Sequence, residues 1–491
     1  MRKPLGALTR SVAIYGAGDV AVTVVSMALL PLYLKVLSPA DMGALGLLIV
    51  TETLVKIGFR WGLDGAFMRF YLDRDEGPQR QRLASTLLVF LGLASGVLLA
   101  VLLLTSPRLA GHLFGVAAGE YLTALRLVLV NTFLLTFTFV PFHVMRMRKQ
   151  AVTFSAFTFG RSVATLLLRI GFVLYAGWGI TGMMLADLIV TLVLLPLLWP
   201  WIRTMWRPSF STVDLRLCLR FGLPRLPHGL AQQALDAGNI YLLGRFIPLE
   251  RMGVYQIGNT IARAIKLFLS AFETGWAPFY YETAKQPDAP MVFRKITTYG
   301  IAMLSILVAG TTAIATDLVN ILTPVAYDDA ALVVPIIALG IAFQGVYLLT
   351  SIGLNLTSQT KYYPLSTFAA AAVGLGSGWM LMPRYGVVGA AVAFALSYAT
   401  LAAVAGYFAR WHYPMTYEVG RIARVILAGI LAAAAGWALP EMPALAGVFA
   451  RGTTTVVVFG VLLWAGGFLR ATERALLTSV WPRAQRKARV S

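Results

Sequence analysis

Long apolar stretches separated by short polar loops run along the whole chain. A bilayer-spanning helix requires roughly 20 mostly apolar residues, and the 491 residues divide into about fourteen such segments. They lie near residues 11–34, 42–63, 83–105, 120–142, 151–175, 180–202, 222–246, 253–280, 295–316, 331–355, 362–382, 386–409, 422–440 and 449–469. The pattern predicts an all-α polytopic membrane protein with about fourteen transmembrane helices. The connecting loops are too short to hold a separate catalytic domain.

Composition agrees with a chain whose solvent is the bilayer, since 58% of the residues are hydrophobic and only 13% are charged. The net charge of +20 does not indicate nucleic-acid binding, because the basic residues concentrate in alternate loops. By the positive-inside rule, this alternation places both termini in the cytoplasm. The basic N-terminus MRKPLGALTR continues into a full-length span without a small-residue cleavage site, which predicts an uncleaved first helix.

Several kinds of chemistry lack their sequence signals. One cysteine, Cys218, excludes an intrachain disulfide, and four scattered histidines predict no metal site. No GxxxxGK[ST] motif is present to bind ATP. We therefore expect a protein that is not an enzyme, uses no cofactor, and moves its substrate with an ion gradient, the membrane potential or the substrate's own gradient.

Two similar segments indicate an internal repeat. The segment KVLSPADMGALG at 35–46 resembles RFIPLERMGVYQ at 245–256 with an offset of 210 residues. This offset places identical residues in register, Met42 on Met252 and Gly43 on Gly253.

A second pair of segments supports the repeat. WGITGMMLADL at 178–188 resembles YGVVGAAVAFAL at 385–396 with an offset of 207 residues. A six-helix unit used twice enters the membrane in the same direction each time, and transporters built in this way hold their substrate between the two lobes. The predicted division is an N-lobe with helices 1–6, a C-lobe with helices 7–12, and helices 13–14 with a basic cytoplasmic tail. These parts correspond to residues 1–212, 213–412 and 413–491.

Charged residues interrupt the second span, where TETLVKIGFRWGLDG at 51–65 places four of them four residues apart: Glu52, Lys56, Arg60 and Asp64. A four-residue step turns a helix by about 40°, so these side chains lie on neighbouring parts of one face. In one interpretation they form two structural ion pairs, Glu52 with Lys56 and Arg60 with Asp64.

The eighth span favours a binding role instead. It contains Arg263 and Lys266, and neither has an acidic residue one turn before it. Facing helices would bring Lys56, Arg60, Arg263 and Lys266 towards a common space with excess positive charge. Such a space suits a phosphate or pyrophosphate group.

Other polar residues in the spans have less specific roles. Four amides are candidates for hydrogen bonds to sugar hydroxyls, although helix–helix contacts are the commoner explanation for such residues: Gln232, Gln233, Asn239 and Asn259. Asp19 and Glu52 are candidate carboxylates for proton or cation coupling. The remaining intramembrane charges are interpreted as structural partners or interfacial side chains: Arg161, Arg169, Asp187, Arg225 and Asp236.

Five segments together resemble the polysaccharide flippases of the multidrug/oligosaccharidyl-lipid/polysaccharide exporter (MOP) superfamily. The segments are LSPADMGALGLL at 37–48, IPLERMGVYQIG at 247–258, GAFMRFYLD at 65–73, ETGWAPFYYETA at 273–284 and YGVVGAAVAFALSY at 385–398. The resemblance implies two lobes in a V around a cationic cavity, alternating access, and transport of an undecaprenyl-pyrophosphate-linked oligosaccharide in the bacterial cytoplasmic (inner) membrane. It also implies a role in O-antigen, capsule or exopolysaccharide assembly, with polysaccharide assembly proteins as candidate partners and H+ or Na+ as candidate coupling ions.

Three alternatives remain open. Lipid II flippases also have fourteen spans and basic residues on helices 2 and 8. A cation-coupled multidrug antiporter would need a cavity rich in carboxylates and aromatic residues, whereas predicted helices 2, 5 and 8 carry more basic than acidic residues. A membrane glycosyltransferase or polysaccharide polymerase would need a sizeable outer loop, and the outer segment DLVNILTPVAYDDA at 317–330 is short.

Overall fold

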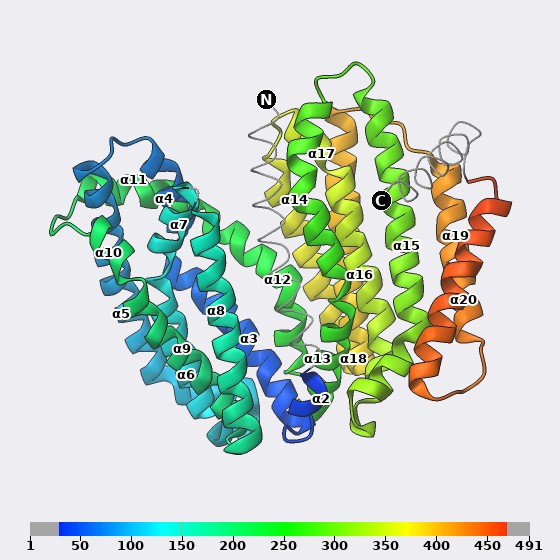
Figure 1. Cartoon of the computed structure of the whole chain (residues 1–491), viewed down its shortest axis with the longest axis horizontal. Coiled ribbons are helices and arrows are strands. Elements are labelled where there is room, and N and C mark those ends of the chain that lie inside the picture. Colours follow the sequence, from blue (N-terminus) through cyan, green and yellow to red (C-terminus); the bar gives the residue numbers. More distant parts are fainter. Residues whose placement is uncertain (1–28, 149, 469–491) are drawn as a thin grey trace, which may run out of the picture.

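The computed structural model describes residues 29–148 and 150–468, which form helices joined by short loops (Figure 1). No strand occurs within these described residues, and the predicted all-α polytopic fold is confirmed. Nine helical segments of this part of the chain are long and apolar enough to cross a membrane. One of them, Pro78–Met147, contains several helices in sequence. Another, Tyr362–His412, is divided by a kink at Gly386, where φ is 51° and ψ is −124°.

One group of helices forms an N-lobe. After the short helix α2 (Leu30–Tyr33), the group comprises α3 (Pro39–Arg60), α4 (Leu63–Leu72), α5 (Pro78–Phe114), α6 (Ala118–Thr136), α7 (Phe139–Met147), α8 (Ala151–Ile170), α9 (Gly179–Leu197) and α10 (Trp199–Met205). The amphipathic helix α11 (Thr212–Gly222) follows and leads to the second group. Most of the first predicted span, 11–34, lies outside the described residues.

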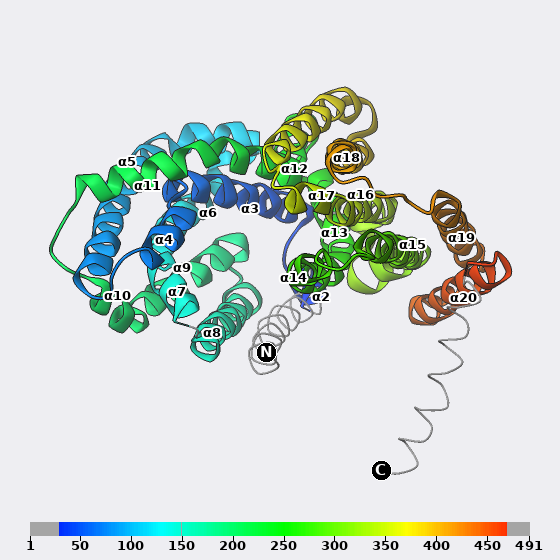
Figure 2. The same cartoon turned by 90° about the horizontal axis from the view of Figure 1, so that it is seen from above.

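The second group forms a C-lobe. It comprises α12 (Leu226–Leu243), α13 (Leu249–Ala262), α14 (Ile265–Thr283), α15 (Ala289–Leu322), α16 (Ala330–Thr350), α17 (Ile352–Leu356) and α18 (Tyr362–His412). The last two helices, α19 (Val419–Trp437) and α20 (Ala444–Ala465), pack against α15 on the side of the C-lobe remote from the N-lobe (Figures 1 and 2). Each predicted span from 42–63 onward coincides with one helix, part of one, or two consecutive helices.

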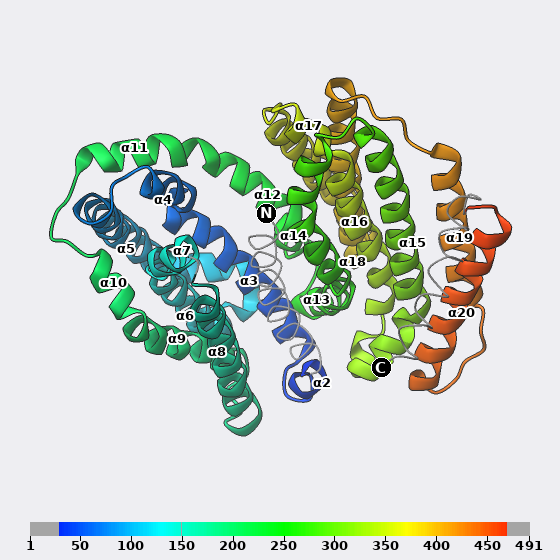
Figure 3. The same ribbon diagram turned by 45° about the horizontal axis from the view of Figure 1, so that its top comes forward.

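The two lobes meet at one end of the molecule and diverge at the other (Figures 1 and 3). They meet where α3 begins and packs against α13. They are separated at the opposite end, where α4 and α11 belong to one side of the V and α14 and α17 to the other. The two lobes therefore form a V that is closed at one end.

The contact between α3 and α13 repeats itself with the symmetry of the sequence. A Cβ atom on Gly43 would collide with the carbonyl oxygen of Leu249, and a Cβ atom on Gly253 would collide with the carbonyl oxygen of Pro39. The two glycines are 210 residues apart, as are Pro39 and Leu249, and this is the offset of the repeat. We call the contact among Pro39, Gly43, Leu249 and Gly253 the α3–α13 seal. Only glycine lets the two backbones approach this closely.

The second predicted span is broken between α3 and α4. Trp61 and Gly62 both have left-handed backbone angles, with φ of 51° and 68°. A Cβ atom on Gly62 would lie 2.5 Å from the carbonyl oxygen of Gly222, at the end of α11. The break therefore lets the chain turn where α11 crosses it.

Candidate functional site

The charges on α3 divide into one pair and two separate residues. Arg60 donates a hydrogen bond to Asp64 at 3.0 Å, so this ion pair bridges the break between α3 and α4. The Glu52–Lys56 pair that the spacing allows is not among the ion pairs of the described residues. The Lys56 side chain is exposed, whereas Glu52 is half-buried. Lys56 is therefore available to a ligand.

A second group of charges in the N-lobe lies on α8 and α9. Arg169 donates from Nε and Nη2 to the two carboxylate oxygens of Asp187 at 2.9 and 2.6 Å. This planar two-point contact is the strongest geometry an arginine and a carboxylate can adopt. Two turns earlier on α8, Arg161 is half-buried and lies within Coulombic range of Glu52 and Asp187. In the described part of this lobe, Arg161 and Lys56 are thus cations that share nearby carboxylates without forming a direct ion pair.

In the C-lobe the charges surround Asp236 of α12. Lys266 donates to the Asp236 carboxylate at 3.1 Å, and the Tyr398 hydroxyl donates to the same oxygen. Arg263 donates to the side-chain oxygen of Asn259 at 2.9 Å and to the backbone oxygen of Asp236 at 3.2 Å. Asp236 therefore binds both Arg263 and Lys266 in one network.

The structure brings Arg263 and Lys266 together and leaves Lys56 and Arg60 on the other lobe. Within the described residues, no hydrogen bond or ion pair joins the two sets. Lys266 and Arg263 keep spare donors, because an ammonium group has three N–H bonds and a guanidinium group has five. Both can bind an anion without leaving Asp236.

The four amides considered as sugar ligands lie in two environments. Asn239 and Asn259 are only 3% and 4% exposed, and Asn259 accepts the hydrogen bond from Arg263. Gln232 and Gln233 are half-buried, and Gln233 lines a cavity of about 450 Å³ between α3, α12 and α18. Asp19 lies outside the described residues.

A larger cavity flanks the α3–α13 seal, with a volume of about 720 Å³. It is lined by both lobes and contains ionisable side chains that the sequence did not single out as ligands: His112, Glu120, Arg245 and Glu250. Local spacing gave no signal for it, because its walls come from three chain segments far apart in sequence.

Two lobes of long apolar helices, closed at one end and carrying, in the described residues, cations without an ion pair, are the architecture of a multi-pass membrane protein. Residues 34–274 match the family described as polysaccharide biosynthesis protein. The match covers just under half of the chain, and it agrees with the flippase resemblance of its motifs. No curated protein matches the sequence significantly.

Solved structures share the fold across most of the chain. The lipid II flippase MurJ in an inward closed conformation has a TM-score of 0.70 and 12% identity, covering 91% of this chain and 99% of MurJ. An inward-facing multidrug resistance MATE family transporter of the MOP superfamily has a TM-score of 0.63 and 16% identity, covering 84% of this chain and 95% of its own. A MOP superfamily transporter from Pyrococcus furiosus, whose binding pocket is described as reversed in polarity, has a TM-score of 0.50 and 15% identity. The match covers 85% of this chain and 96% of that transporter.

At these identities the likeness establishes the fold. The chain shares the fold of these structures, which are described as a lipid II flippase and as a multidrug resistance transporter.

Proposed function

We propose that this protein flips an undecaprenyl-pyrophosphate-linked oligosaccharide from the inner to the outer leaflet of the bacterial cytoplasmic membrane. The match to a polysaccharide biosynthesis family and the MOP fold support this class of substrate. The observation that carries the proposal is the cation Lys56, exposed within a membrane-spanning helix and free of an ion pair in the described residues. A charge at this depth costs about 2.5–3.5 kcal/mol on insertion scales, which favours a functional role.

The pyrophosphate binds between the lobes in this proposal. Lys56 supplies the free ammonium group, and the spare donors of Arg263 and Lys266 approach from the C-lobe. Arg60 contributes the donors that Asp64 leaves unused. Gln232 and Gln233 are better placed for the glycan than the buried amides Asn239 and Asn259, while the lipid tail stays in the bilayer.

Alternating access explains the two ends of the molecule. With both termini in the cytoplasm, the diverging end faces the cytoplasm and the α3–α13 seal closes the outer face. The protein in this state accepts its substrate from the inner leaflet. Rocking of the lobes, proposed as residues 1–212 and 213–412, opens the seal and releases the glycan outside for O-antigen, capsule or exopolysaccharide assembly.

Energy input is part of the proposal. Glu52 is the described carboxylate best placed to couple transport to H+ or Na+, because it lies within Coulombic range of Lys56 and Arg161. Protonation of Glu52 would raise the positive charge that the pyrophosphate meets. Asp19 is the other candidate. Polysaccharide assembly proteins at the outer face are the proposed partners.

The test is transport in liposomes that carry a fluorescent undecaprenyl-pyrophosphate oligosaccharide. The wild type should move the lipid to the opposite leaflet, and Lys56→Ala/Lys266→Ala should lose most of this activity while inserting normally. The control Lys285→Ala/Lys361→Ala removes two exposed loop lysines and should transport normally. Full activity of the Lys56→Ala/Lys266→Ala variant would refute the binding site.

The same liposomes distinguish the alternatives. MurJ is a lipid II flippase, so labelled lipid II is the second substrate. Transport of lipid II alone would reassign the substrate within the flippases. Exchange of a cationic drug, without movement of either lipid, would favour the multidrug antiporter.

A further inference from the structure

Helix α11, between the two lobes, has one buried face. Asp214, Cys218 and Gly222 are spaced four residues apart and are all buried. Cys218 packs in the same apolar cluster as Leu63 and Phe67 of α4. This face fixes which side of α11 meets the N-lobe.

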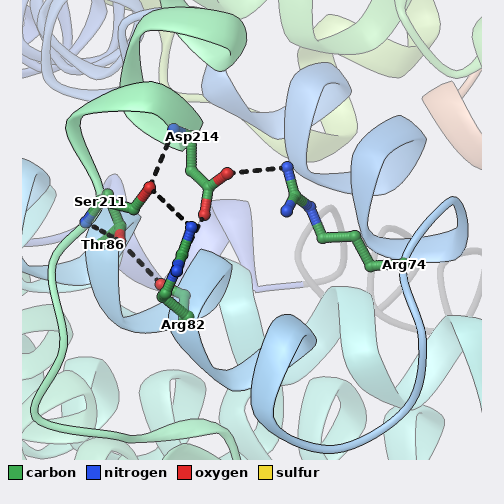
Figure 4. Close-up of polar contacts among 5 residues, drawn as sticks. All are labelled: Arg74, Arg82, Thr86, Ser211 and Asp214. Carbon is green, nitrogen blue, oxygen red and sulfur yellow. Dashed lines mark hydrogen bonds and ion pairs between the residues drawn. The ribbon is translucent and has the colours of Figure 1, made fainter.

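Polar contacts hold the start of α11 in the same orientation (Figure 4). Asp214 is bound by Arg74 at 2.8 Å and by Arg82 at 3.3 Å. The Ser211 hydroxyl accepts from the backbone N–H of Asp214 and from Arg82, both at 3.2 Å. The backbone N–H of Ser211 donates to Thr86 at 3.0 Å. Asp214 is only 2% exposed, so its charge is buried and is paired with these two arginines of the N-lobe.

The opposite face of α11 mixes apolar and basic side chains. Val213 is 73% exposed and Leu217 is 40% exposed. Arg216 and Arg220 are exposed beside them. The preceding loop adds further exposed side chains of both kinds: Trp206, Arg207 and Phe210.

This face carries no negative charge. Between residues 199 and 225 the sequence contains one acidic residue, the buried Asp214. The same stretch contains five arginines: Arg203, Arg207, Arg216, Arg220 and Arg225. The exposed surface is therefore cationic along its whole length.

The position of α11 suits the edge of a bilayer. Figures 1 and 3 show it lying across the diverging end of the N-lobe, where the spanning helices finish. Figure 2 shows it at the rim of the lobe, leading to α12. A helix of this kind, with apolar and aromatic residues beside arginines, lies in the membrane interface.

We infer that the exposed face of α11, formed by Val213, Arg216, Leu217 and Arg220, binds anionic phospholipid headgroups of the cytoplasmic leaflet. Val213 and Leu217 enter the boundary of the acyl chains, while the two arginines contact the phosphates. The inference rests on the orientation given under the proposed function. Since α11 is fastened to the N-lobe and continues into the C-lobe, the bound lipids hold the N-lobe end of this connection at the membrane surface.

A fluorophore on Val213→Cys measures the lipid next to α11 directly. Quenching by phosphatidylglycerol with a spin label near the top of its acyl chain is compared with quenching by the same label on phosphatidylcholine. Cys218 does not interfere because it is fully buried, and the wild-type chain treated with the same dye verifies this. We expect stronger quenching by phosphatidylglycerol, with a preference that high salt reduces.

Charge variants test the arginines. In the labelled protein, Arg216→Gln/Arg220→Gln should lower the preference for phosphatidylglycerol by up to about fivefold for each arginine, and Arg216→Lys/Arg220→Lys should retain it. The control Arg108→Gln/Arg384→Gln changes exposed arginines of the opposite end and should have no effect.

Equal quenching by the two lipids, or quenching by neither, would overturn the inference. Because this measurement needs no transport, it stands apart from the flipping assay. Selective lipid binding without flipping would refute the proposed transport alone, and flipping without selective binding would refute the role of α11.

Discussion

The α3–α13 seal offers the sharpest test of the transport cycle. In Gly43→Ala/Gly253→Ala, each new methyl group meets the carbonyl oxygen of the opposite helix, Leu249 in one case and Pro39 in the other. A backbone carbonyl cannot rotate away as a flexible side chain can. The two helices must therefore separate, and the change acts only on the conformation in which they touch.

The size of the effect follows from the overlap. Forcing additional methyl groups into a well-packed contact costs about 1–3 kcal/mol. In the proposed transport cycle this cost falls on the state closed at the outer face, because the seal parts in the other state. The equilibrium should therefore move towards the open outer face by about 5- to 150-fold.

Distances between two spin labels measure this shift. Lys35→Cys and Arg245→Cys place labels on repeat-related, exposed positions beside the seal. The alanine variant should gain a population at longer distance. Gly46→Ala is the matched control, since its methyl group would meet only the flexible Gln256 side chain, at 3.1 Å. An unchanged distance distribution in folded Gly43→Ala/Gly253→Ala would refute the reasoning.

Three further predictions concern single residues. Asp187→Asn should lower the free energy of unfolding by about 1.5–3 kcal/mol, because Arg169 loses its charged partner; an unchanged melting temperature in detergent would contradict this. Gly386→Ala should cost about 1–3 kcal/mol in the same assay, since φ is 51° at this kink. Burial raises the pKa of the Cys218 thiol to about 11, so its reaction with maleimide should be slow at neutral pH and rise with pH as thiolate forms. Rapid labelling of the folded protein at neutral pH would show that α11 is detached.

The spans and the repeat could be predicted because the length of an apolar stretch and the offset between two similar segments are both visible in the sequence. The break in the helix after Arg60 could not be predicted. Trp61 has a left-handed backbone that nothing in its identity favours. The close approach of Gly222 to Gly62 comes from a helix far along the chain. Similarly, the offset aligned Gly43 with Gly253, but only the structure shows that each touches the other's helix.

The partners of the intramembrane charges could be predicted only where both residues lie on the same stretch of chain. Arg60 and Asp64, four residues apart, do form an ion pair. Lys266 instead finds its carboxylate on another helix, at Asp236. Spacing along one helix contains no information about such a partner. The binding roles of these cations therefore stay predictions.

The reciprocal glycine contacts also bear on the origin of the chain. An interface in which residue i of one unit meets residue j of the other, and j meets i, is characteristic of symmetric dimers. Gly43 with Leu249 and Gly253 with Pro39 satisfy this relation inside one polypeptide. The seal thus has the form of a homodimer whose two subunits were fused. After fusion the two halves can change independently, and they now differ in how equivalent charges are paired: Lys56 has no ion pair in the described residues, whereas Lys266 is held by a carboxylate.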